Sequence, residues 1–168
     1  MSTNDVRVLI IDPDISVREQ CKRLLAVDEV QSYDFLEASD GESGLAMVRE
    51  HSPECVLLRF GLPDTDGVKL ANRIDALISE SPIATVMLTS QGTEELEARA
   101  VINGAQELVA IRDLGRIELH KIVQRALVNC ALQDCSQKEE RALRARIADL
   151  EIENRALREE LEKLRGAA

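Results

Sequence analysis

The chain has no tryptophan, one tyrosine and two phenylalanines among its 168 residues. Hydrophobic residues still make up 45% of the sequence, so a core can form, but it must be an aliphatic one. This length has room for one domain of ordinary size and an appendage.

Positive charge is also scarce. The chain carries 21 lysines and arginines against 31 acidic residues, a net charge of −10. Because duplex binding depends on basic surface that neutralises phosphates, we expect no nucleic-acid binding by this chain alone. Proteins or cations are the expected partners.

Long apolar runs and paired cysteines are missing as well. No run approaches the roughly 18–20 residues that span a bilayer, and the start, MSTNDVRVLIIDPD, lacks the basic and apolar regions of a signal peptide. We therefore expect a cytoplasmic protein without a membrane partner. The cysteines show no CxxC spacing, which predicts reduced structural thiols at Cys21, Cys55, Cys130 and Cys135.

Short β-branched runs alternate with amphipathic helical patterns up to about residue 130. The expected strands are Val6–Ile11, Asp34–Ala38, Cys55–Arg59, Ala84–Thr89 and Glu107–Ile111. The expected helices are Ser16–Ala26, Glu42–Glu50, Val68–Ser79, Glu94–Asn103 and one from Arg116 onward. This alternation predicts an α/β fold with five parallel strands and helices on both faces.

In open parallel sheets, function sits at the carboxyl ends of the strands. The side chains expected at that edge follow the first, third, fourth and fifth strands: Asp12, Asp14, Arg59, Thr89, Ser90, Ile111 and Arg112.

Several segments carry a family resemblance in their order and spacing: VLIIDPDISVRE, EASDGESGLAMV, LLRFGLPDTDGVKLANRI and PIATVMLTSQGTEELEARAVINGAQELV. Over about residues 5–130 the chain resembles the receiver domain of bacterial response regulators. The resemblance implies a flavodoxin-like fold with strand order 2-1-3-4-5. Active members of the family accept a phosphoryl group from a histidine kinase on an aspartate after the third strand, using Mg²⁺.

This sequence departs from the family pattern at the positions that perform the chemistry. Arg59 occupies the phospho-acceptor position, Pro13 replaces the second acid after the first strand, and Ile111 stands where a lysine is expected. Leu108 replaces the usual switch aromatic, whereas Thr89 keeps the switch hydroxyl. The resemblance therefore implies a degenerate receiver, a pseudo-receiver.

A guanidinium cannot accept a phosphoryl group, and its charge beside Asp12 and Asp14 competes with Mg²⁺. We expect no catalytic residue, no enzyme activity, no metal site and no cofactor. Arg59 is expected to form an internal ion pair with Asp12 or Asp14; the alternative is that it points to solvent over the pocket rim.

Asp64 and Asp66 could be surrogate acceptors. The PDTDG segment is better explained as a turn into the next helix, with Asp66 as its N-cap.

No glycine or proline interrupts residues 116–165, which permits one helix of about 50 residues. Within it, apolar residues recur with heptad spacing. The d positions are Leu143, Leu150, Leu157 and Leu164, and the a positions are Ile147, Asn154 and Leu161. A single a-position asparagine favours a two-stranded, in-register coiled coil.

Charges flanking this seam predict a parallel homodimer. The g and e residues that would face each other across a parallel pair are opposite in sign in all four cases: Glu139–Arg144, Arg146–Glu151, Glu153–Arg158 and Glu160–Arg165. A solvated single helix is the alternative, and it leaves four in-phase leucines exposed. A DNA-reading zipper needs a basic helix before the heptads, whereas Gln133–Arg146 mixes acids with bases.

Carried upstream, the heptads place polar side chains in the seam at Gln133, Ser136 and Glu140, followed by Ala126 and Ile122. We therefore expect a weak joint over Asn129–Glu140.

The expected organisation is a receiver-like domain over residues 1–130 and a helical linker with a parallel dimeric coiled coil over 131–168. The expected function is an atypical response-regulator-like module for protein interaction and dimerisation that works without phosphorylation and binds a signalling protein of unknown identity. Two alternatives stay open. One is the regulatory piece of a larger enzyme whose output domain follows the coil, and the other is an authentic phospho-accepting regulator.

Overall fold

The computed structural model describes residues 5–77, 82–90, 107–115 and 118–166. Its strands are β1 (Val6–Ile11), β2 (Tyr33–Ala38), β3 (Cys55–Arg59), β4 (Ala84–Thr89) and β5 (Glu107–Ala110). Its helices are α1 (Ile15–Leu25), α2 (Gly41–His51), α3 (Gly67–Leu77), the 3-10 turn η1 (Ile111–Asp113) and α5 (Leu119–Gly166). The predicted helix Glu94–Asn103 lies outside the described residues.

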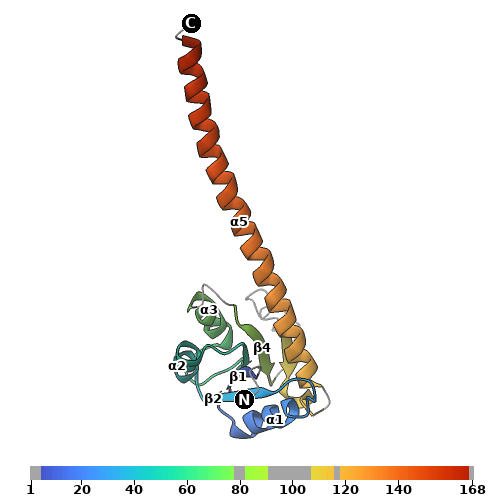
Figure 1. The fold of residues 1–168 in the computed structure, drawn as a ribbon. Coiled ribbons are helices and arrows are strands. Elements are labelled where there is room, and N and C mark those ends of the chain that lie inside the picture. The colour runs from blue at the N-terminus through green and yellow to red at the C-terminus, as the bar shows by residue number, and fades with distance from the viewer. Residues whose placement is uncertain (1–4, 78–81, 91–106, 116–117, 167–168) are drawn as a thin grey trace. The chain divides into compact units, whose positions relative to one another are not determined.

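The five strands form one parallel sheet in the order β2-β1-β3-β4-β5, as predicted. Figure 1 labels β1, β2 and β4 of this sheet among the helices. One face packs against α1 and the first turns of α5, and the other packs against α2 and α3. Because β1, β3 and β4 are covered on both faces, their residues are almost continuously buried. The fold is the flavodoxin-like one that the sequence predicts.

Element boundaries differ from the prediction by one residue in places. The fifth strand ends at Ala110, and Ile111 begins the 3-10 turn η1, so its assignment to the strand was wrong. The first helix begins at Ile15 rather than Ser16, because the Asp14 side chain accepts a hydrogen bond from the Ser16 backbone N–H and caps the helix there.

The chain divides into two compact units, Met1–Ala131 and Leu132–Ala168. In the first unit, α5 buries the face that carries Leu119, Val123, Ala126 and Cys130. The second unit contains the rest of this 48-residue helix, so the single long C-terminal helix is confirmed.

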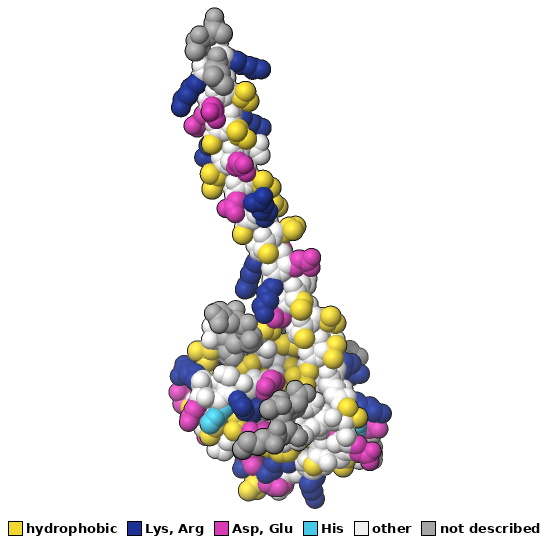
Figure 2. All heavy atoms as spheres, in the orientation of Figure 1, with side chains coloured by type: hydrophobic (Ala, Val, Ile, Leu, Met, Phe, Trp, Pro, Cys, Tyr) yellow, Lys and Arg dark blue, Asp and Glu magenta, His cyan; other side chains and the backbone are white. Residues whose placement is uncertain are grey.

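The second unit leaves its apolar side chains exposed between charged ones (Figure 2). The exposed apolar residues in the seam register are Leu143, Ile147, Leu150, Leu157 and Leu161. Across the described residues, no helix combines the length and apolarity needed to cross a membrane.

Candidate functional site

Arg59 and Asp12 meet at the carboxyl edge of the sheet, where the neighbouring strands β3 and β1 end. The Arg59 Nη1 atom lies 3.1 Å from the Asp12 Oδ2 atom. The Asp12 side chain is fully buried, and that of Arg59 is 21% exposed. The predicted ion pair is therefore confirmed, with Asp12 rather than Asp14 as the partner, and the alternative of a guanidinium free in solvent is wrong.

The remaining polar atoms of Asp12 also have protein partners. Its Oδ1 atom accepts a hydrogen bond of 2.8 Å from the Asp14 backbone N–H, and its carbonyl oxygen accepts one of 2.7 Å from Arg18 Nη1. The Asp14 side chain caps α1, and the intervening Pro13 has no polar side chain. The acidic residues after β1 are thus bound to the protein itself.

Ion pairs between α1 and β2 stabilise the structure beside Asp12. Arg18, which holds the Asp12 carbonyl, also places its Nε atom 2.9 Å from Glu37 Oε2. Lys22 Nζ lies 2.7 Å from the other oxygen of Glu37. Hydrogen bonds from Lys22 and then Arg18 hold the pKa of Glu37 below its usual value.

The charge of Asp12 also acts on a thiol in the core. Burial, with a smaller contribution from the negative charge of Asp12, raises the pKa of Cys21 to about 12. A thiol with such a pKa stays protonated and unreactive near neutral pH. This agrees with the prediction that Cys21 is a reduced structural residue, and Cys55 and Cys130 are buried in the same core. Cys135 is exposed, so its assignment as a structural thiol was wrong for the single chain.

The loop between β3 and α3 is fixed by two aspartates. Asp66 Oδ1 accepts a hydrogen bond of 2.8 Å from the Val68 backbone N–H, so its predicted role as the cap of α3 is confirmed. Asp64 accepts hydrogen bonds from the backbone N–H groups of Gly41 and Glu42, at 2.9 and 3.0 Å, and thereby caps α2. The sequence analysis missed this second role, because the partners lie more than twenty residues away in the chain.

The other positions that the resemblance singled out are packing positions. Ile111 is partly buried against the core shared by α1 and α5, and Leu108 packs against the core under α2 and α3. Thr89 is 2% exposed at the end of β4. The lost lysine and aromatic positions therefore contribute apolar contacts rather than charge or a ring.

The residues at this edge do not fit Mg²⁺. That ion needs several oxygen ligands in near-octahedral geometry. Here one carboxylate oxygen of Asp12 faces the Arg59 guanidinium, the other accepts a backbone hydrogen bond, and Pro13 offers no side-chain oxygen. No cluster of three or more His, Cys, Asp or Glu side chains within the described ranges could hold a metal ion.

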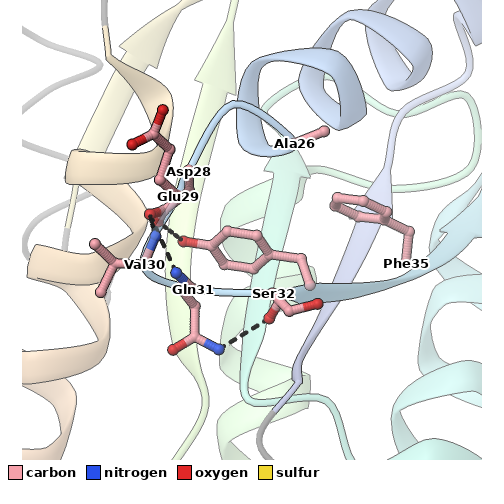
Figure 3. A pocket seen from close by; sticks show the side chains of 8 residues that line it. Ala26, Asp28, Glu29, Val30, Gln31, Ser32 and Phe35 are labelled. Atoms are coloured by element: carbon pink, nitrogen blue, oxygen red, sulfur yellow. Dashed lines mark hydrogen bonds between the residues drawn. The ribbon is translucent and has the colours of Figure 1, made fainter. Parts of the chain in front are cut away.

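A cavity of about 370 Å³ lies elsewhere, beside the loop between α1 and β2 (Figure 3). Its walls include Tyr33 and Phe35, whose rings stack with centroids 6.3 Å apart. Asp28 accepts hydrogen bonds from the Tyr33 hydroxyl (2.9 Å) and from Gln124 Nε2 (2.7 Å). These contacts fasten the loop to α5, so the polar groups of the cavity serve the packing of the domain.

Comparison with known proteins identifies the domain that carries this site. The family model for the response regulator receiver domain matches residues 8–124. The phosphate regulon transcriptional regulatory protein PhoB of Pseudomonas aeruginosa is 32% identical over 104 residues, which is 61% of this chain and 43% of that protein. The transcriptional regulatory protein SrrA of Staphylococcus aureus is 29% identical over 102 residues, which is 61% of this chain and 40% of that protein.

Solved structures agree with the sequence relatives. The signal receiver domain of the putative response regulator NarL from Mycobacterium tuberculosis superposes with a TM-score of 0.65 at 25% identity, over 74% of this chain and 97% of that one. A CheY-like receiver domain protein from Methanospirillum hungatei gives a TM-score of 0.62 at 23% identity, over 77% and 98%. The chain spans about two fifths of the length of its curated relatives. It belongs to the response regulator receiver domain family.

Proposed function

We propose that this receiver is a pseudo-receiver: a protein-interaction and dimerisation module of two-component or related signalling that works without phosphorylation. The observation that carries the proposal is the ion pair between Arg59 and the buried Asp12. In active members of the family, the position of Arg59 holds the aspartate that accepts the phosphoryl group. Arginine has no nucleophilic oxygen and stays protonated in proteins.

The ion pair supplies internally the positive charge that a buried carboxylate needs. At 3.1 Å, two unit charges attract each other by about 5 kcal/mol if the effective dielectric constant is about 20. Desolvation of both groups offsets much of this attraction. Even so, the pair neutralises Asp12 without a metal ion, and a cation entering the site would have to displace Arg59. The input to such a domain is then the binding of another protein.

The second unit supports dimerisation. The described side chains in the a and d positions, including Leu150, Asn154 and Leu157, are exposed in the single chain. Burying them against a second helix would stabilise the pair of helices. The four g–e pairs of opposite charge favour a parallel, in-register copy. The proposed active form is therefore a homodimer joined through residues 143–164 of α5.

A second candidate function follows from the relatives. PhoB and SrrA are named as transcriptional regulatory proteins, and this chain matches about two fifths of each. The same module could thus be the regulatory part of a longer regulator or enzyme, with the coil aligning two output domains. An authentic phospho-accepting regulator shares the same receiver fold, and the chemistry at Arg59 is what separates it from both of these candidates.

A Mg²⁺ titration followed by amide chemical shifts tests the filled site. In the native chain we expect no saturable, localised shifts around Asp12 up to millimolar Mg²⁺. The variant Arg59→Asp is the positive control, because it removes the guanidinium and adds a carboxylate beside Asp12, and it should show such shifts. Localised binding of similar affinity in the native chain would contradict the proposal.

The dimer is tested by the mass of the particle in solution. The full chain should be a dimer, and a chain ending at Ala131, where the first compact unit ends, should be a monomer. A dimer that persists after the truncation would place the interface on the receiver unit.

A further inference from the structure

The part of α5 that precedes the zipper seam has an exposed apolar face of its own. Leu132 is 64% exposed, and Cys135, one turn further on, is also exposed. These two residues are three apart, so they lie on one face of the helix. Neither the core of the receiver nor the heptad seam accounts for them.

The heptad register offers no apolar seam upstream of Leu143, which is why the sequence analysis expects a weak joint over Asn129–Glu140. From Leu143 it leads through Ser136, Gln133 and Asn129, which are polar, to Ala126, which is fully buried in the core of the first unit. A partner helix following this register would lose all apolar contact and then meet a side chain that is already covered.

An eleven-residue spacing leads instead to the exposed face. Leu132 precedes Leu143 by eleven residues. Eleven residues make three turns at about 3.67 residues per turn, close to the 3.6 of a straight helix, so such positions stay on one side of an almost straight helix. Positions seven residues apart, in contrast, stay on one side only if the helices wind into a left-handed supercoil.

We propose that the interface between the two copies continues from Leu143 to Leu132 in this eleven-residue phasing. The inference rests on the proposed dimer and specifies how its seam continues upstream of Leu143. Cys135 then lies at the interface, whereas the heptads place it at a c position, outside. The turn that holds Glu139 and Glu140 is polar in both registers, so it is the weakest part of the joint.

A second copy of the chain is the occupant that this face fits. The face continues along the same helix into the seam whose flanking charges complement an identical parallel helix, beginning with Glu139 and Arg144. In a parallel, in-register pair, residues of the same number meet. Leu132 should therefore lie opposite Leu132 of the other copy.

Cysteine cross-linking of the full chain separates the two registers. The background variant Cys135→Ser removes the one exposed native thiol, since the other three cysteines are buried. Leu132→Cys, Gln133→Cys and Leu150→Cys are then introduced one at a time and treated with a mild oxidant. Both joint positions are exposed, so neither variant should disturb the fold, and circular dichroism checks this.

We expect Leu132→Cys to form the interchain disulfide roughly tenfold faster than Gln133→Cys, because disulfides need Cα atoms within about 7 Å. Leu150→Cys, in the centre of the zipper, reports on the dimer itself and should also cross-link. If Leu150→Cys cross-links while Gln133→Cys equals or exceeds Leu132→Cys, or while neither joint variant reacts, the eleven-residue phasing is wrong and the dimer stands. If Leu150→Cys does not cross-link, the proposed dimer fails as well.

Discussion

Replacing Arg59 by alanine should destabilise the receiver through the charge that it leaves behind. The Asp12 carboxylate is fully buried, and Arg59 is its ion-pair partner. Removal of one partner of a buried pair typically costs about 3–5 kcal/mol, because the other charge stays uncompensated. Arg59 is 21% exposed, so water can partly replace it, and we expect a loss near the lower end, about 3 kcal/mol.

A double-mutant cycle with Asp12→Asn isolates that contribution. The asparagine keeps the shape of the side chain, and its amide oxygen can still accept the hydrogen bond from the Asp14 backbone N–H. With no charge at position 12, Arg59→Ala should cost about 1 kcal/mol, the loss of packing alone. The coupling energy between the two sites should then be about 2 kcal/mol.

The assay is urea unfolding followed by the fluorescence of Tyr33. Because the chain has one tyrosine and no tryptophan, this signal comes only from β2 of the receiver unit. All four proteins are compared at one concentration, so that dimerisation contributes equally. An equal loss on Arg59→Ala in both backgrounds, within about 0.5 kcal/mol, would refute the reasoning that the pair neutralises Asp12.

Three further outcomes are expected. Gly67→Ala should lower the free energy of unfolding by about 1–3 kcal/mol, because the added Cβ would come within 2.4 Å of the Arg59 carbonyl oxygen. Gly61→Ala is the matched control in the same urea assay, because its Cβ would meet nothing within 4 Å. Equal losses in the two variants would contradict this expectation. Arg146→Glu should weaken the dimer by about 0.2–1 kcal/mol per ion pair, as measured by sedimentation equilibrium. The double variant Arg146→Glu with Glu151→Arg should restore the dimer affinity, and a double variant that associates no more tightly than the single one would count against the parallel pairing. In the Cys135→Ser variant no thiol should react quickly with a thiol reagent, because Cys21, Cys55 and Cys130 are buried and should react only after denaturation. One or more fast thiols in this variant would show that the core opens readily.

The sheet was predictable because its determinants are local. The runs VLII and CVLL are apolar throughout, as strands covered on both faces must be, and polar or small residues mark where each strand ends. Strand order came from the family resemblance rather than from these runs. The end of the fifth strand was misplaced by one residue, because Ile111 is β-branched and apolar like a strand residue yet begins a 3-10 turn.

The candidate site was predictable only in part. Its members could be gathered from the sequence, since all of them follow parallel strands and must share one edge. The choice of Asp12 over Asp14 as the partner of Arg59 depends on the hydrogen bond by which Asp14 caps α1, which composition and spacing do not specify. The hydrogen bond from Arg18 to the Asp12 carbonyl and the cap that Asp64 makes on α2 join residues from different elements. No local sequence pattern predicts such contacts.

The central claim is that no phosphoryl group can be accepted where Arg59 stands. Incubation of the full chain with a small phosphodonor and Mg²⁺, read by intact mass, tests it most directly. We predict an unchanged mass. A gain of one phosphoryl group that mild base removes, as expected of an acyl phosphate on an aspartate, would contradict the account.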